Sequence, residues 1–116
     1  YKKGLEGLNL KFLEIPKNVR SSVHLGVVIL KNFSDTDHKI IFSELRKNGV
    51  GVQLHYSPVH LNPYYRKMGF KEKDFINSEN YARRAISLPI YPGLTDENLN
   101  EIITIIRYVL KNHDQV

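Results

Sequence analysis

The sequence predicts a two-layer α/β domain in which a small sheet is packed on one side by helices. Three observations support this fold class. Strand and helix patterns alternate along the chain, residues 23–30 (VHLGVVIL) are apolar on both faces of a strand, and residues 99–110 carry a helical stripe of apolar side chains. A strand that is apolar on both faces and a helix that is apolar on one face each need a covering layer. A sheet and helices packed together provide both.

Length and composition fit a single soluble domain. The chain has 116 residues, of which 41% are hydrophobic and 25% are charged, and no apolar run approaches the roughly 18 residues of a membrane helix. The first residues lack the apolar core of a signal peptide, and the chain has no cysteine, which fits a reducing compartment. We therefore expect a cytoplasmic protein that does not enter a membrane.

The charge of the chain is moderately basic, with 17 Lys and Arg against 12 Asp and Glu and a net charge of +5. The basic residues are spread along the sequence with no run longer than two. Proteins that bind nucleic acid usually cluster these residues on one face or arm, so we expect no nucleic-acid partner. A small phosphorylated ligand could still meet two or three of these charges.

Two strands are predicted before the first helix. Residues 8–15 alternate loosely between apolar and polar side chains, and Pro16-Lys17-Asn18 ends the segment as a turn, which is typical of an edge strand. The fully apolar segment 23–30 is predicted as the next strand, covered on both faces.

A helix is predicted to follow the turn at residues 32–34. Either Ser34 or Asp35 can cap it, because both side chains accept hydrogen bonds from the free amide groups of a first helical turn. Apolar side chains four positions apart form its buried stripe, and Asn48-Gly49 ends the helix. The alternating, valine-rich residues 50–54 are predicted as a strand.

The second half of the chain is predicted to hold two short helices and a strand. PYYRKMG, residues 63–69, reads as a helix with proline at its first position and a closing glycine. Ser78 is expected to cap a helix that spans residues 79–85. AISLPIYPG, residues 85–93, then gives a short strand that two prolines interrupt.

The last helix has the clearest signal in the sequence. Thr95-Asp96-Glu97-Asn98 places acidic side chains at its positively polarised start. The apolar residues that follow keep helical spacing up to Leu110, and Lys111-Asn112-His113 ends the helix.

The loop at residues 55–65 has an unusual composition, with two histidines, three tyrosines and two prolines in eleven residues. One interpretation is a stiff connection packed against the sheet. The other is a recognition surface, in which aromatic rings stack on a polar ligand such as a sugar or nucleotide while imidazole and phenol groups bond to it. Proline would restrain such a loop before the ligand arrives and so lower the cost of ordering it. Composition alone leaves both interpretations open.

Other kinds of chemistry have weak support in this sequence. The histidines at 55 and 60 lack a third metal ligand, because no acidic residue lies between Glu44 and Glu72, so we expect no metal site. A triad of Ser57, His60 and Asp74 lacks the turn geometry of a serine nucleophile. The glycines at 49 and 51 precede a predicted strand rather than a helix, which argues against a phosphate-binding loop.

Several motifs in the second half of the chain resemble one known family. They are GVGV at residues 49–52, HY-x-P-x-H at 55–60, PYY at 63–65, SE-x-YA at 78–82 and SLP-x-YP-x-LT at 87–95. In order and spacing they resemble the C-terminal small domain of the DegT/DnrJ/EryC1/StrS family of sugar aminotransferases, which depend on pyridoxal phosphate (PLP). HLNPYY is most similar to the members that aminate UDP-linked 4-keto-6-deoxy amino sugars.

The resemblance implies that residues 1–116 are the small domain of a fold-type I PLP aminotransferase, without the cofactor-binding large domain. In this family a lysine of the large domain holds PLP, and glutamate is the usual amino donor. No lysine of this sequence lies in that motif. The resemblance therefore predicts no catalytic residue, no cofactor-binding residue and no bound PLP in this chain, which would be inactive alone. It predicts PLP, a nucleotide-sugar substrate and a homodimer for the full-length enzyme.

The resemblance also assigns a role to the loop after residue 54, at the mouth of the active site. His55 and Tyr56 would line the active site from the small-domain side. The residues that would approach the nucleotide-sugar substrate are His60, Asn62, Tyr64 and Tyr65. Arg66 and Lys67 could meet its diphosphate, although a helix-surface role is also open.

Two alternatives to the aminotransferase fragment stay open. The chain could be a free-standing module that binds a sugar nucleotide without catalysis. It could also be an assembly module that uses an exposed apolar face for self-association.

Overall fold

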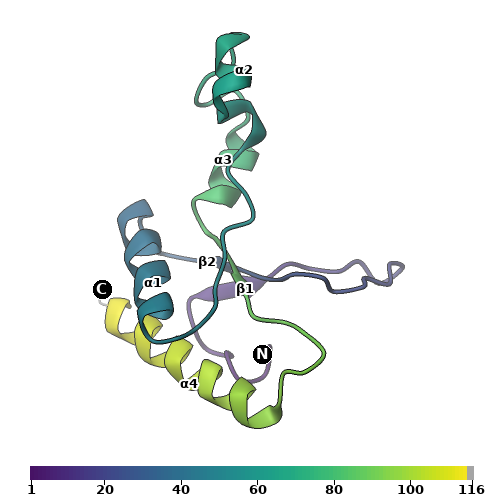
Figure 1. Cartoon of the computed structure of the whole chain (residues 1–116), viewed down its shortest axis with the longest axis vertical. Helices are drawn as coiled ribbons and strands as arrows, with labels where there is room; N and C mark the ends of the chain where they lie inside the picture. The colour runs from purple at the N-terminus through teal and green to yellow at the C-terminus, as the bar shows by residue number, and fades with distance from the viewer. Residues whose placement is uncertain (115–116) are drawn as a thin grey trace.

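The computed structural model describes residues 1–114 and contains a three-stranded antiparallel sheet with helices packed on one face. The strands are β1 (Leu10–Phe12), β2 (Gly26–Leu30) and β3 (Ala85–Leu88), in the order β1-β2-β3. Two long helices, α1 (Asp35–Lys47) and α4 (Asp96–His113), cover the sheet (Figure 1). The predicted fold class, a small sheet covered by helices, is confirmed.

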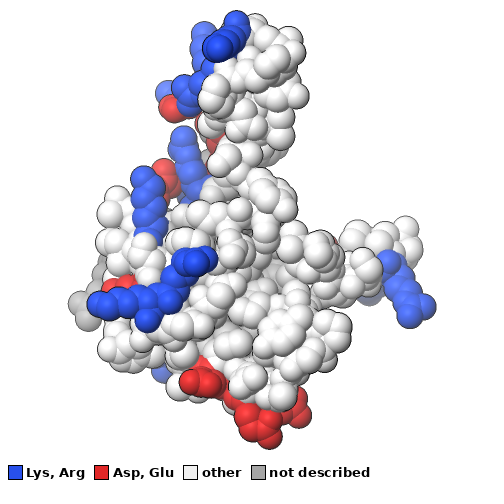
Figure 2. Space-filling view, in the orientation of Figure 1, with Lys and Arg blue, Asp and Glu red and all other residues white. Residues whose placement is uncertain are grey.

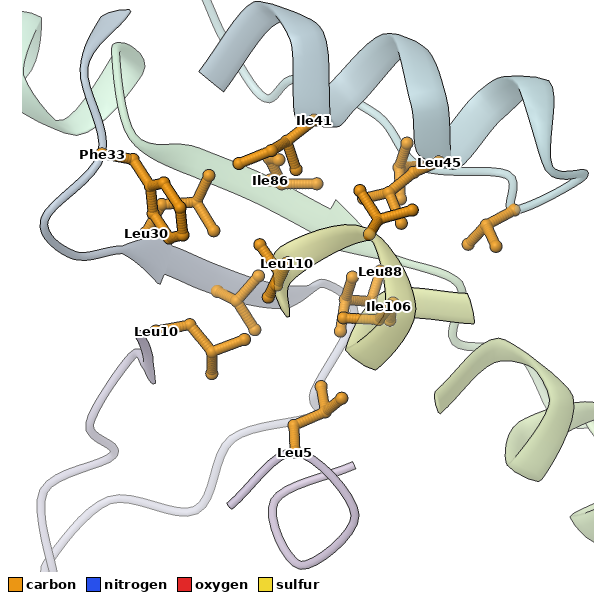
Figure 3. Close-up of a cluster of buried hydrophobic side chains, with 14 residues drawn as sticks. Leu5, Leu10, Leu30, Phe33, Ile41, Leu45, Ile86, Leu88, Ile106 and Leu110 are labelled. Carbon is orange, nitrogen blue, oxygen red and sulfur yellow. The ribbon is translucent and has the colours of Figure 1, made fainter. Parts of the chain in front are cut away.

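The hydrophobic core lies between the sheet and these two helices, as Figure 3 shows. Ile41 of α1 and Ile106 of α4 meet Ile86 of β3, and all three are at most 2% exposed. Successive side chains of a strand point to opposite faces, so Ile86 and Leu88 enter this core while Ser87 points to the other face of the sheet.

Helix α1 begins as its sequence predicts. Ser34 is the cap: its hydroxyl accepts from the Asp37 amide, while the Asp37 carboxylate accepts from the Ser34 amide at 2.8 Å. The Ser34 hydroxyl also donates to the Asp37 carboxylate at 2.7 Å, and this bond, together with the one from the Ser34 amide, holds the pKa of the Asp37 carboxyl below its usual value. Helix α4 begins in the same way, with the Thr95 hydroxyl accepting from the Asn98 amide.

A group of short helices projects from the body of the molecule (Figure 1). We call this segment, residues 57–82, the arm. It contains the 3₁₀ turn η1 (Val59–Leu61) and the helices α2 (Pro63–Lys67) and α3 (Ile76–Ala82). The predicted short helix with proline at its first position is confirmed as α2. Gly69, whose φ of +100° suits glycine, follows it.

The first two strands are shorter than predicted. Residues 13–25 leave the sheet and project as an extended hairpin (Figure 1), with Leu13, Ile15, Val19 and Val23 each at least 45% exposed. Val23 also has a positive φ of 50°, which is incompatible with a strand. These apolar residues are therefore not buried in the sheet, and for this reason the predicted strands were too long.

The predictions of a strand at residues 50–54 and of a Ser78 cap were wrong. Val50 and Val52 are at most 2% exposed, so their alternation reflects burial against the core, but only Gln53 forms a bridge to β3. Helix α3 begins at Ile76 after Phe75, with no side-chain cap, and Ser78 lies in its first turn. The helix starts earlier because the Glu79 amide already bonds the Phe75 carbonyl.

Candidate functional site

His55 is held against the edge of the sheet by two neighbours. Gln53 exchanges backbone hydrogen bonds with Ser87 of β3 at 2.9 and 3.1 Å, which fixes the chain two residues before His55. His55 Nδ1 lies 2.9 Å from the Ser87 hydroxyl, which is itself only 5% exposed. This contact holds the imidazole beside β3.

Two pockets meet at His55. The first pocket, of about 370 Å³, lies between α1, the loop and α3, and its wall includes Tyr56, Lys39 and Arg83. The second pocket, of about 560 Å³, lies along the edge of the sheet and is lined by residues that include His24, Gln53, Ser87 and Tyr91. His55 lines both pockets, so it occupies the boundary between them.

The predicted site residues differ in how far they face solvent. Tyr56 and Tyr64 are 72% and 70% exposed, Asn62 is also exposed, and Tyr65 is half-buried. The His55 and Tyr56 rings meet edge to face with 4.6 Å between their centroids, as do Tyr64 and Tyr65 at 5.2 Å. The structure thus gathers these residues in two aromatic pairs, one beside the sheet and one on α2.

His60 is the predicted site residue that points inward. It is 7% exposed, and its Nε2 lies 3.0 Å from Oε1 of Glu79, which is 1% exposed. The same carboxylate oxygen accepts from the Lys73 amide at 2.8 Å. Burial acts to raise the pKa of the Glu79 carboxyl, but the hydrogen bonds from His60 and Lys73 outweigh it and hold the pKa below its usual value.

Glu79 is a residue to which the sequence interpretation gave no role. It was visible only as part of the SE-x-YA motif, because an acidic residue near the start of a helix ordinarily faces solvent. Its second oxygen, Oε2, is enclosed and has no hydrogen-bond partner within residues 1–114. Arg83 Nη2 lies 3.6 Å from it, and Arg83 Nε lies 3.7 Å from Asp35 at the start of α1. Through Arg83, these ion pairs connect Glu79 of the arm to Asp35 of the body.

The residues of this chain do not form a complete PLP site. A Schiff base needs a lysine amine directed into the cofactor pocket, and Lys39, the lysine that lines the first pocket, is solvent exposed. No lysine, aspartate or glutamate of the described chain lines the second pocket. Neither pocket at His55 therefore presents an enclosed lysine among the described residues.

Neither a metal site nor a membrane-spanning segment is found in the described part of the chain. Within residues 1–114, no three His, Asp or Glu side chains are grouped closely enough to hold a metal ion. Among the described helices, none combines the length and the apolar character required to cross a bilayer.

Comparison with known proteins identifies relatives of this arrangement. The model of the DegT/DnrJ/EryC1/StrS aminotransferase family matches residues 1–107. The spore coat polysaccharide biosynthesis protein SpsC of Bacillus subtilis is 42% identical over 98 residues, which are 82% of this chain and 25% of SpsC. The UDP-4-amino-4,6-dideoxy-N-acetyl-beta-L-altrosamine transaminase of Helicobacter pylori is 30% identical over 95 residues, or 82% of this chain and 24% of that protein.

Solved structures show the same fold. The PLP form of the putative sugar aminotransferase Spr1654 from Streptococcus pneumoniae matches with a TM-score of 0.89 and 27% identity, over 96% of this chain and 29% of that one. Helicobacter pylori PseC, an aminotransferase of pseudaminic acid biosynthesis, matches with a TM-score of 0.85 at 22% identity, over 96% and 30% of the two chains, and so supports the fold alone. The present chain spans about a quarter of the length of the curated relatives it matches.

Proposed function

This chain belongs to the DegT/DnrJ/EryC1/StrS aminotransferase family, and from that premise we propose that residues 1–116 form the C-terminal small domain of an aminotransferase that acts on a nucleotide-linked keto-sugar. The family is PLP-dependent, and Spr1654 has been solved in PLP and PMP forms. The relatives named for spore coat polysaccharide and UDP-amino-sugar biosynthesis support the substrate class. Glutamate as amino donor and a homodimeric assembly are parts of the same proposal.

The observation that carries this proposal is the fixed position of His55 at the meeting point of two pockets. Its Nδ1 is engaged by Ser87, so the ring has a set orientation, and its Nε2 has no partner within residues 1–114. Either tautomer of the ring leaves Nε2 able to make one hydrogen bond. His55 therefore orients a polar substrate group, and the exposed ring of Tyr56 beside it offers stacking area.

In this proposal, cofactor chemistry and substrate binding belong to different parts of the enzyme. When bound, PLP supplies the carbonyl and the electron-withdrawing ring of the reaction, and its anchoring amine would come from the part of the protein outside this chain. Residues 53–65 would bind and orient the sugar and would help to exclude water from one side. This role requires side chains directed outward, as Tyr56, Asn62 and Tyr64 are.

The arm also suits a substrate that carries a diphosphate. Figure 2 shows Lys and Arg side chains at its far end, and the sequence places four of them there: Arg66, Lys67, Lys71 and Lys73. The acidic residues beside them are Glu72, at 3.6 Å from Arg66, and Asp74, which accepts from the Lys71 amide. The excess of positive charge favours an anionic group near the arm.

A chimera tests the proposal. The quarter of SpsC, the Bacillus subtilis relative, that this chain matches is replaced with this chain. The purified protein is examined for PLP absorbance and for amination of a UDP-linked 4-keto sugar with glutamate. We expect PLP absorbance and turnover from the chimera and neither from the 116-residue chain alone. A matched variant, His55→Ala, should keep the PLP absorbance and lose at least about tenfold in kcat/KM, because the substrate loses an orienting contact.

Two results would contradict the proposal. A folded chimera that holds PLP but does not aminate any nucleotide-linked keto-sugar would exclude the assigned substrate class. Unchanged kinetics in His55→Ala would show that the residue does not face the substrate. Ser43→Ala, an exposed position on α1, serves as the control for non-specific effects of substitution.

A further inference from the structure

A third pocket lies within the arm, apart from His55. It measures about 320 Å³, which is at the small end of the range of about 300–1,000 Å³ for small-molecule sites. All of its lining residues belong to the arm, and none lines either pocket at His55. They are Val59, His60, Tyr65, Phe70, Phe75 and Ser78. We call it the arm pocket.

The walls of the arm pocket are mostly aromatic. Phe70 lies between Tyr65 and Phe75, with ring centroids 6.3 and 6.0 Å away, and Phe75 lies 4.9 Å from the ring of His60. Phe70 and Phe75 remain 37% and 49% exposed although they line this pocket. The rings pack against one another, and their exposed faces suit a flat ring that stacks against them.

The pocket also contains a polar atom with a defined role. The Glu79 carboxylate can only accept hydrogen bonds, so the bond at 3.0 Å requires that His60 Nε2 carries the hydrogen. In the neutral imidazole, Nδ1 is then an acceptor. Within residues 1–114, Nδ1 has no hydrogen-bond partner. It is also not fully enclosed, so a ligand can reach it. Because His60 lines the arm pocket, its accessible Nδ1 is the ring atom that can bond to a ligand there.

These groups together define the chemistry of a ligand. The ligand is a flat ring that presents an N–H group to His60 Nδ1, and Ser78 adds a hydroxyl that can donate to a neighbouring carbonyl. Uracil and thymine combine these features, since their ring N–H lies between two carbonyl groups. The lysines and arginine adjacent in sequence to the pocket walls can meet the phosphates that such a base carries.

We propose that the arm pocket binds the uracil-type base of the nucleotide-linked substrate, with His60 Nδ1 accepting the imide N–H and the aromatic rings stacking on the base. This inference rests on the proposed function, which requires a nucleotide-linked sugar. It gives the residues from His55 to Tyr65 a joint task, because the loop then connects a sugar-facing end at the sheet to a base-facing end on the arm.

An NMR titration of the ¹⁵N-labelled 116-residue chain tests the proposal, with UDP, CDP, 3-methyluridine diphosphate and inorganic pyrophosphate as probes. We expect UDP to shift the amide signals of His60, Phe70 and Phe75. CDP presents an acceptor at the ring position of the imide N–H, and 3-methyluridine carries a methyl group there, so both should bind about tenfold more weakly. Pyrophosphate should leave the signals of Phe70 and Phe75 unchanged.

Two matched valine variants separate the arm pocket from general effects. Val59→Trp introduces a large side chain at a lining position that is 61% exposed, so it should block the pocket without disturbing the fold. Val19→Trp places the same side chain on the hairpin, at a position that is 51% exposed. We expect UDP binding to fall at least tenfold in the first variant and to stay unchanged in the second.

The possible outcomes distinguish this proposal from the proposed function. Equal affinity for UDP and 3-methyluridine diphosphate, or unchanged binding in Val59→Trp, overturns the base pocket. No UDP-induced shift in the arm also overturns it, and a chimera that still aminates the UDP-sugar would then leave the aminotransferase function standing. Selective UDP binding at the arm with an inactive chimera supports the pocket and rejects the aminotransferase function.

Discussion

His60 Nε2 lies 3.0 Å from Glu79 Oε1, and this contact joins the loop of the candidate site to helix α3. Both side chains are buried, in an arm where Tyr64, Met68, Phe75 and most of the other large side chains are exposed. The pair therefore supplies much of the interior of a segment that is too small to build a hydrophobic core of its own.

Protonation of Glu79 at low pH should destabilise the arm. Its pKa lies below the ordinary value of 4.5 in the folded state, so its stabilising contribution is complete above about pH 4.5 and is lost as the pH falls through the folded-state value. Glu79→Gln should remove this part of the acid transition, measured by circular dichroism against pH. Asp37 also has a lowered pKa, so the comparison is the difference between variant and wild type. Glu72→Gln, at a carboxyl that is 62% exposed, is the control.

Ser87→Ala should uncouple His55 from the sheet. The variant loses a partly buried hydrogen bond of about 1 kcal/mol and little else, so the chain should stay folded. In the SpsC chimera we expect kcat/KM to fall on the order of tenfold, because the imidazole is no longer held in one orientation. A loss of stability with no change in kcat/KM would restrict Ser87 to a structural role.

Two neighbouring isoleucines of α1 offer a matched test of the core. Ile41 is 0% exposed and Ile40 is 39% exposed. Ile41→Ala should lower the free energy of unfolding by about 2–5 kcal/mol, because it leaves a cavity beneath the helix. Ile40→Ala should change it by less than about 1 kcal/mol. Urea denaturation measures both values, and similar losses in the two variants would contradict the placement of the core.

Ionisation of Tyr1 at high pH should lower the stability of the fold. Burial, with a smaller effect from Tyr91, raises the pKa of the Tyr1 phenol from 10.0 to about 12, and its hydroxyl donates to the Pro89 carbonyl at 2.8 Å. A raised pKa in the folded state means that this contribution to stability is complete below pH 10 and is lost between about pH 10 and 12.

The measurement is the stability of Tyr1→Phe across this alkaline range. The variant should lose stability less steeply than the wild type, because it has no phenol at this position to ionise. Tyr108→Phe, at a tyrosine that is 62% exposed, should keep the wild-type slope. Identical slopes in all three proteins would show that Tyr1 is not buried as described.

The parts of the fold that the sequence predicted are those set by local chemistry. Ser34, one of the two predicted candidates, caps α1, acidic residues stand at the start of α4 as expected, and the apolar stripe of α4 follows from residue spacing alone. The failed strand at residues 50–54 shows the limit of periodicity. A period of two reports which side chains are buried, and Val50 and Val52 are buried without a backbone ladder.

The arrangement of the side chains in the candidate site could not be predicted from the sequence. The outward positions of Tyr56 and Tyr64 agree with a recognition loop, whereas the inward position of His60 depends on Glu79, which lies 19 residues away. A contact at that sequence distance has no local signal. The same holds for His55 and Ser87, which are 32 residues apart and meet only because Gln53 docks on β3.

The pairing of β3 with β2 has a consequence for any engineering of this chain. Val28 faces Ile86, and Val27 faces Ser87, so the hydroxyl that anchors the imidazole depends on the alignment of two strands. Shifting that alignment by a single position would present Ile86 or Leu88 to His55 and bury the serine among the core side chains. An insertion or deletion within β3 should therefore disrupt the core and the anchor of His55 together, whereas lengthening the hairpin at residues 13–25 should leave both in place.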